Sequence, residues 1–338
     1  MAQSGAARGE GWHVKPFTAA AALLALVVLL ASSVGSVNIP PAEIAGAVWR
    51  GLTGGAANTH DVIVWRVRMP RVLSAALVGG ALAMSGAAYQ GVFRNPLAEP
   101  YLLGVASGAG FGAALGIAFA GNTPLGVSAL SFLGALVGVA AVVTLARRGA
   151  KLPIVSLILA GVVLGSLASA ATSYLMLLSQ ENAAATLAWL LGSFSLSSWP
   201  KLQLLFPVVL ASAFVLQGFA RALNLLQLGD DQAAQLGLNV ELSKLILIVT
   251  ATVMTAVAVS LAGVIGFAGL MVPHAVRLLL GPDYRKLMPM SLLLGGVFMV
   301  LADLAARSLL SPAELPVGVV TALTGAPFFL WLLRRTPR

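Results

Sequence analysis

The feature that most constrains this chain is its series of long stretches without a charged side chain. From Tyr101 to Ala146 no Asp, Glu, Lys or Arg occurs, and shorter uncharged stretches recur along the rest of the sequence. A helix of about 20 apolar residues crosses the roughly 30 Å hydrocarbon core of a bilayer with every backbone polar group bonded internally. Only 9% of the 338 residues are charged, against about 25% in soluble domains. The sequence therefore predicts an all-α integral membrane protein.

Charges and turn residues divide the uncharged stretches into ten predicted membrane helices. Gly121-Asn122-Thr123-Pro124 separates the third helix from the fourth, and Gly263, Gly266 and Gly269 interrupt a run that is too long for one helix. The expected spans are 17–37, 72–92, two within 101–146, 153–178, 202–220, 245–262, 267–280, 287–305 and 315–333.

Two segments near the predicted first and sixth helices need separate interpretation. The stretch from Phe17 is longer than the core of a usual secretory signal, so we expect a retained first helix. Pro40 to Arg50 is expected to form a short amphipathic helix, and residues 179–200 an outer surface segment.

Basic residues orient the predicted helices. Cytoplasmic loops of membrane proteins carry an excess of Lys and Arg. With both termini in the cytoplasm, about fourteen of the 20 Lys and Arg lie inside. The six outside are Arg50, Arg66, Arg68, Arg71, Lys201 and Arg307. We thus expect one transmembrane domain over 1–338, with a cytoplasmic N-terminal tail (1–16) and a cytoplasmic segment at about 222–244. The outer arginines are the exception to the rule, and they indicate an acidic partner outside the membrane.

Ionisable residues inside the predicted helices are few, which limits the chemistry of the chain. Asp303 precedes Arg307 by one helical turn, so we expect an ion pair. His274 has no second His or carboxylate nearby and is expected to be a packing residue, not a metal ligand. No set of nucleophile, base and metal ligands converges, which disfavours an enzyme. The scarcity of buried acids disfavours an ion-coupled secondary transporter, which is kept as the alternative function. The net charge of +9 arises at helix ends, so no nucleic-acid partner is expected.

Two predicted helices carry small residues at every fourth position, and these form a stripe along one face of each helix. The third helix has Gly104, Gly108, Gly112 and Gly116, for which helix packing is the favoured interpretation. The fifth has Gly161, Gly165, Ser169 and Ser173. Because this second stripe adds hydroxyl groups to glycines, packing and the lining of a solute pathway are equally good interpretations.

The segment between the sixth and seventh helices is polar and is predicted to contain a short cytoplasmic helix. Asp230 is expected to be its N-cap, Asp231 to favour the positive end of the helix dipole and Gly237 to end it. The aspartates could instead bind Mg²⁺, but the residues from Gln232 to Val240 supply no further acidic ligand. Leu236 and Leu238 are apolar residues that fit the groove of a partner protein better.

Several motifs occur together in one order and at characteristic spacings. They are Arg68-Met69-Pro70-Arg71; Gly86 to Gln90; Asn95-Pro96-Leu97-Ala98-Glu99-Pro100 with Leu103-Gly104-Val105; Gly266 to Leu270, Pro273-His274 and Arg277; and Glu314 to Gly318 with Gly325-Ala326-Pro327. With them, the chain resembles the membrane permease family of bacterial binding-protein-dependent ABC importers for iron-siderophores, haem and cobalamin. The resemblance covers about residues 17–335.

The resemblance implies the following partners and residue roles. The permease would be a multi-pass protein of the bacterial inner membrane that pairs with a second copy or a paralogue. It would assemble with two cytoplasmic ATPase subunits, which bind ATP-Mg, and with a periplasmic or lipid-anchored substrate-binding protein. The binding protein would dock on Arg68, Arg71 and Arg307. The ATPase would engage Asp230, Asp231, Leu236, Gly237 and Leu238. The translocation path would include Gly161, Gly165, Ser169 and Ser173. Motif residues with structural roles would be Asn95, Pro96, Pro100, Gly104, Pro273 and His274.

The chain itself is expected to need no cofactor. It contains no Gly-x-x-x-x-Gly-Lys-Ser/Thr loop to bind phosphate, so ATP hydrolysis is expected in a separate subunit. No residue distinguishes siderophore, haem and cobalamin as the cargo.

Overall fold

The computed structural model describes residues 11–35, 39–55, 58–119, 123–149 and 151–335. Within these ranges all the regular structure is helical, which confirms the predicted all-α class. The elements are α1 (Gly11–Ser33), α2 (Pro41–Leu52), α3 (Thr59–Val62), the π-helix η1 (Ile63–Arg68), α4 (Met69–Phe93), α5 (Val105–Phe119), α6 (Pro124–Ala146), α7 (Ile154–Leu178), α8 (Gln180–Leu190), α9 (Trp199–Gly218), α10 (Ala220–Leu226), α11 (Asp230–Gln235), α12 (Val240–Ala262), α13 (Ala268–Leu280), α14 (Tyr284–Ser308) and α15 (Val317–Arg335).

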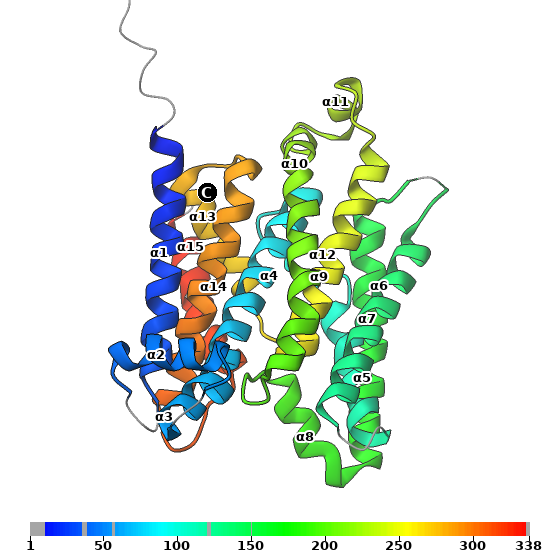
Figure 1. Cartoon of the computed structure of the whole chain (residues 1–338). Coiled ribbons are helices and arrows are strands. Elements are labelled where there is room, and N and C mark those ends of the chain that lie inside the picture. Colours follow the sequence, from blue (N-terminus) through cyan, green and yellow to red (C-terminus); the bar gives the residue numbers. More distant parts are fainter. Residues whose placement is uncertain (1–10, 36–38, 56–57, 120–122, 150, 336–338) are drawn as a thin grey trace, which may run out of the picture.

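The long helices lie side by side in one bundle (Figure 1). In the described part of the chain, seven helices are long and apolar enough to cross a membrane, and α5, α13 and α15 are shorter apolar helices. The start of α1, the end of α15 and the short helix α11 lie at one end of the bundle, whereas α2, α3 and α8 lie at the other (Figure 1). An even number of membrane crossings places the two ends of the chain on the same side, and the positions of α1 and α15 agree with this. The number ten and the cytoplasmic position of the termini stay predictions.

The predicted start of the second helix is wrong. Helical structure runs without interruption from Thr59 through η1 and α4 to Phe93. The Arg68-Met69-Pro70-Arg71 motif therefore lies within the helix and not before its expected start at residue 72. Pro70 has no N–H to donate to the preceding turn, and the Trp65 carbonyl in that turn accepts instead from the Trp199 Nε1–H at 2.7 Å.

Other boundaries differ for local reasons. The surface segment 179–200 contains the helix α8 and the first residues of α9. The third helix begins at Val105 and not at Tyr101, because Gly104 adopts a left-handed φ of +76° that ends the preceding turns. The expected break at Gly121-Asn122 lies outside the described residues, as do Arg8 and Arg338.

Glycines set the distances between helices in the core, where α4 is almost completely buried. A Cβ atom on Gly79 would lie 2.2 Å from the carbonyl oxygen of Gly295 on α14. Between α5 and α6, a Cβ on Gly108 would lie 2.5 Å from the carbonyl oxygen of Gly134, and one on Gly112 would lie 2.1 Å from that of Leu130. These backbones approach more closely than any side chain would allow. The interpretation of the third-helix stripe as a packing surface is thus confirmed.

Candidate functional site

The helices α5 and α13 are both too short to cross a membrane, and the non-helical segments before them meet inside the bundle. The 13 residues of α13 extend only about 20 Å. Glu99 Oε1 accepts a hydrogen bond from the Phe267 N–H at 3.2 Å. The Tyr101 hydroxyl donates to the Ile265 carbonyl at 2.9 Å and accepts from the Ile265 N–H at 3.2 Å. We call these four residues the junction. Irregular backbone at membrane depth occurs only inside protein or beside a cavity, so the junction indicates a functional region.

A hollow of about 590 Å³ lies beside the junction. It is lined by Glu99, Tyr101, Leu102, Gly104, Ser107, Gly161, Val162, Gly165, Ser166 and Ser169. Three of the four predicted path residues on α7 are therefore in its wall. Ser173 is exposed outside the hollow, and its hydroxyl donates to the Ser169 carbonyl at 3.0 Å.

The α7 stripe combines packing with an open wall. A Cβ on Gly161 would lie 2.3 Å from the Leu102 carbonyl oxygen, so this end of the stripe is a packing contact. Near Gly165 the closest atom to such a Cβ is the Ser107 hydroxyl oxygen at 3.2 Å, and Ser169 is exposed. The packing interpretation is thus confirmed at Gly161, and the lining of a solute pathway by the open part of the stripe stays a prediction.

The three arginines predicted to dock a binding protein, Arg68, Arg71 and Arg307, make internal contacts, and we call them the outer arginine cluster. Arg71 binds the Asp303 carboxylate (Nη2 to Oδ1, 2.9 Å) and the Glu314 carboxylate (Nη1 to Oε1, 2.8 Å). Arg307 Nε lies 3.7 Å from Asp303 Oδ2, which confirms the predicted ion pair.

Backbone carbonyls at the end of α1 provide the other acceptors of this cluster. Arg68 Nη1 donates to the carbonyls of Ser32 and Ser33 at 2.7 and 2.9 Å, and Arg307 donates to that of Ala31. The last carbonyls of a helix carry partial negative charge, which favours cations there. Arg66, in contrast, is exposed. Docking on the cluster stays a prediction.

The predicted ATPase-coupling residues lie on and just after α11. Asp230 is not the N-cap: that position is Gly229, whose φ of +109° only glycine adopts easily. The Asp230 carboxylate instead contacts Lys244 Nζ at 2.5 Å and Arg94 Nη2 at 3.5 Å. Asp231 lies in the first turn of α11, as predicted.

The end of α11 exposes an apolar side chain. Gly237 has a φ of +87° and its N–H donates to the Ala234 carbonyl at 3.0 Å, which confirms its predicted role in ending the helix. Leu236 is 61% exposed, whereas Leu238 is half-buried. The exposed apolar side chain at this end of α11 is therefore Leu236, and its contact with a partner stays a prediction.

The motif residues outside these regions have structural roles. The Asn95 side chain accepts from the Leu97 N–H at 2.9 Å and stabilises the turn that contains Pro96. Pro100 packs on Gly269 of α13. His274, which follows Pro273 in α13, packs edge-on against Phe328 and Phe329 of α15, with ring centroids 6.3 and 6.0 Å apart. No group of three or more potential metal ligands occurs among the described residues.

Sequence reasoning missed the junction and the long-range ion pairs. One signal was available, because Glu99 is the only charged residue between Arg94 and Arg147 and an isolated acid in an apolar region indicates function. No sequence signal connected Phe267 with Glu99, or Arg71 with Asp303.

Comparisons with known proteins agree with the predicted class. The FecCD transport family matches residues 23–335. The cobalamin import system permease protein BtuC of Halobacterium salinarum is 42% identical over 94% of this chain and 88% of the relative. The hemin transport system permease protein HmuU of Yersinia pestis is 39% identical over 96% and 97%. A solved inward-facing structure of a metal-chelate type ABC transporter superposes with a TM-score of 0.84 at 32% identity, covering 96% of this chain and all of that one.

Proposed function

Because the chain belongs to the FecCD transport family, as a membrane permease subunit and not an enzyme, we propose that it imports a metal chelate into the cytoplasm at the expense of ATP. The observation that carries this proposal is the similarity along nearly the whole chain to permeases named for cobalamin and hemin. Relatives from Helicobacter pylori are named for iron chelatin, at 42% identity over 82% of this chain. Ferric siderophore, haem or cobalamin is therefore the proposed cargo class.

The proposed orientation has ten membrane crossings with both termini and α11 in the cytoplasm. It is supported by the shared end of α1, α15 and α11 (Figure 1). In this orientation α11 meets a separate ATPase subunit, which binds ATP-Mg. Leu236 would enter a groove of that subunit, and Asp230 would hold α11 in place through Lys244.

The proposed path runs along α7 and the hollow beside the junction. Its wall of small residues with weakly polar hydroxyls suits a bulky chelate better than a single charged site would. The face of α7 that carries Ser169 and Ser173 is exposed in the single chain, and we place a second copy of the permease opposite it. The cargo would then pass between the two copies.

The proposed docking surface for an outer binding protein is the outer arginine cluster. Glu314 is 43% exposed, whereas Asp303 is 1% exposed. An acidic residue of the binding protein would therefore compete with Glu314 for Arg71, while Asp303 stays bound. This exchange would keep Arg71 paired throughout, and the displaced Glu314, which is exposed, would be solvated by water.

The test is uptake of a ferric siderophore, haem or cobalamin into proteoliposomes that contain the permease, its ATPase and its binding protein. We expect uptake with ATP and no ion gradient. Uptake driven by a proton or sodium gradient without ATP would instead establish the alternative, an ion-coupled secondary transporter. A variant of the ATPase that binds but does not hydrolyse ATP is the matched control and should abolish uptake.

A further inference from the structure

Lys201 is a largely enclosed lysine whose ammonium group has no partner in the described part of the chain. It is the third residue of α9 and is only 8% exposed. Within the described part of the chain its ammonium group makes no hydrogen bond or ion pair. Lys244, which is 3% exposed, shows the usual arrangement, because Asp230 neutralises it at 2.5 Å. The ammonium group itself opens into a hollow, where an anionic ligand would supply a counter-charge to a lysine that is otherwise enclosed.

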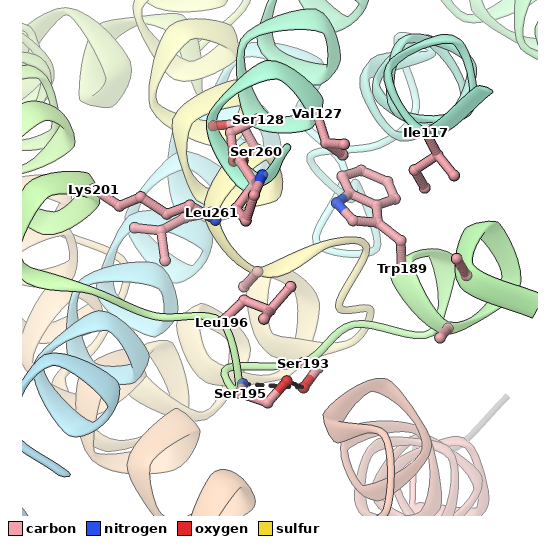
Figure 2. A pocket seen from close by; sticks show the side chains of 14 residues that line it. Ile117, Val127, Ser128, Trp189, Ser193, Ser195, Leu196, Lys201, Ser260 and Leu261 are labelled. Atoms are coloured by element: carbon pink, nitrogen blue, oxygen red, sulfur yellow. Dashed lines mark hydrogen bonds between the residues drawn. The ribbon is translucent and has the colours of Figure 1, made fainter. Parts of the chain in front are cut away.

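The Lys201 side chain extends into a hollow of about 270 Å³ between the ends of α5, α6, α8, α9 and α12 (Figure 2). Trp189 lies on the opposite side, and Ser193 and Ser195 lie on a loop below (Figure 2). Among the described residues, no Asp or Glu lines this hollow, which we call the Lys201 pocket. The Lys201 ammonium group can therefore pair with an anionic ligand, since no acidic residue of the pocket wall competes for it.

Three polar groups of the Lys201 pocket have a hydrogen left to donate, whereas the Ser128 and Ser260 hydroxyls donate to the carbonyls of Pro124 and Val257. The Ser195 hydroxyl accepts from Ser193 Oγ at 3.0 Å, which leaves its own hydrogen free to donate. Among the described residues, the Trp189 indole N–H has no acceptor. Together with the three hydrogens of the Lys201 ammonium, these groups match an anionic oxygen group such as a phosphate.

The surroundings of the pocket favour an anion that carries hydrocarbon. The rest of the lining is apolar, and includes Ile117, Val127 and Leu261. Two exposed leucines extend this apolar surface on the neighbouring helices: Leu125 on α6 is 61% exposed and Leu204 on α9 is 60% exposed. Trp side chains gather where a bilayer meets water, and Lys side chains near helix ends extend their ammonium groups to this interface, where lipid phosphates lie.

We propose that the Lys201 pocket binds the phosphate of a phospholipid, with the acyl chains along the apolar surfaces of α6 and α9. The choice of the outer leaflet rests on the proposed orientation of the permease. The proposed binding of a lipid phosphate does not depend on that orientation, because this chain supplies Lys201 and all the other residues that line the pocket.

The test is native mass spectrometry of the full-length permease in detergent, without ATPase, so that its result does not depend on transport. The probes are phosphatidylglycerol, dioleoylglycerol, which lacks a phosphate, and inorganic phosphate. We expect one tightly bound phosphatidylglycerol per chain and weak binding of the other two. Lys201→Met should weaken the binding about tenfold or more, whereas Lys201→Arg should retain it. Lys151→Met, at an exposed lysine, is the control and should have no effect.

Two results would overturn the proposal. One is wild-type affinity of Lys201→Met for phosphatidylglycerol. The other is binding of inorganic phosphate as tight as that of the lipid, which would assign the pocket to a free anion. If Lys201→Met does not fold, Ser195→Phe fills the pocket from an exposed loop position and keeps the lysine. This variant should lose the tightly bound lipid, and unchanged binding would equally reject the proposal.

Discussion

Replacing Asp303 with Asn should destabilise the permease strongly, because Asp303 is the buried counter-ion of two arginines. It is 1% exposed, and the side chains of Arg71 and Arg307 beside it are 12% and 7% exposed. Arg71 donates to it from Nε at 3.0 Å and from Nη2 at 2.9 Å. The Asn side chain removes the negative charge and turns an NH₂ group toward donors, so Arg307 would lose the carboxylate beside it and Arg71 would keep Glu314.

The structure gives a magnitude for this change. Removing one partner of a buried ion pair costs about 3–5 kcal/mol, whereas an exposed pair contributes about 0–1 kcal/mol. Glu314 also binds Arg71 but is 43% exposed. We therefore expect Asp303→Asn to lower the free energy of unfolding by about 3–5 kcal/mol and Glu314→Gln by less than about 1 kcal/mol.

Reversible unfolding by SDS titration in mixed micelles measures these differences, with Glu314→Gln as the matched control. The double variant Arg71→Met/Asp303→Leu should recover much of the loss, because apolar residues of similar size leave less charge without a counter-ion. If Asp303→Asn unfolds at the same SDS concentration as Glu314→Gln, Asp303 is not the dominant counter-ion, and the reasoning from burial is wrong.

Three further predictions concern other regions. Leu236→Asp should release the ATPase subunits in detergent, measured by co-purification, because the groove that receives Leu236 would have to bury a carboxylate; normal co-purification would show that another residue makes the contact. A Cys at Ser169 should react with a water-soluble thiol reagent and change its reactivity when ATP is added, whereas a Cys at the half-buried Leu175 should react less; equal labelling of both would exclude Ser169 from the path. The Arg71 guanidinium lowers the pKa of Glu314 below its usual 4.5, so Glu314 stabilises the protein fully above about pH 4.5 and loses this effect as the pH falls through its lower folded-state pKa. The difference in stability between wild type and Glu314→Gln should therefore disappear in acid, and a difference that grows in acid would contradict this sign.

The sequence predicted the helices well because the physical requirement behind them is local. Each apolar stretch must bond its own backbone in lipid, so the presence of helices could be predicted from hydropathy alone. The starts of α4 and α5 were less predictable, since they depend on a π-helix before Pro70 and a left-handed residue at Gly104. Neither conformation has a signal in hydropathy.

Ion pairs were predictable only where both partners lie on one helix. Asp303 and Arg307 are four residues apart, and their spacing was sufficient. Arg71 and Asp303 are 232 residues apart and meet because α4 and α14 pack along the glycines Gly79 and Gly295. The expectation of outward-facing arginines followed from counting charges without knowing that α14 and the loop after it supply two carboxylates.

The contacts of Asp230 indicate how a movement of α11 would reach the junction. Asp230 binds Arg94, which precedes the Asn95–Pro100 turn, at 3.5 Å with both side chains more than a third exposed. It binds Lys244 of α12 at 2.5 Å with the lysine buried. The buried pair is the stronger of the two, because water screens the exposed one, so α11 should move with α12 and slide against the turn. Since α12 continues as one helix to Ala262, three residues before Ile265, it connects α11 directly to the junction. A movement of α11 caused by an ATPase would then shift Ile265 and Phe267. The Asn95–Pro100 turn would keep Glu99 and Tyr101 in place. The hydrogen bonds that join Glu99 to Phe267 and Tyr101 to Ile265 would therefore break.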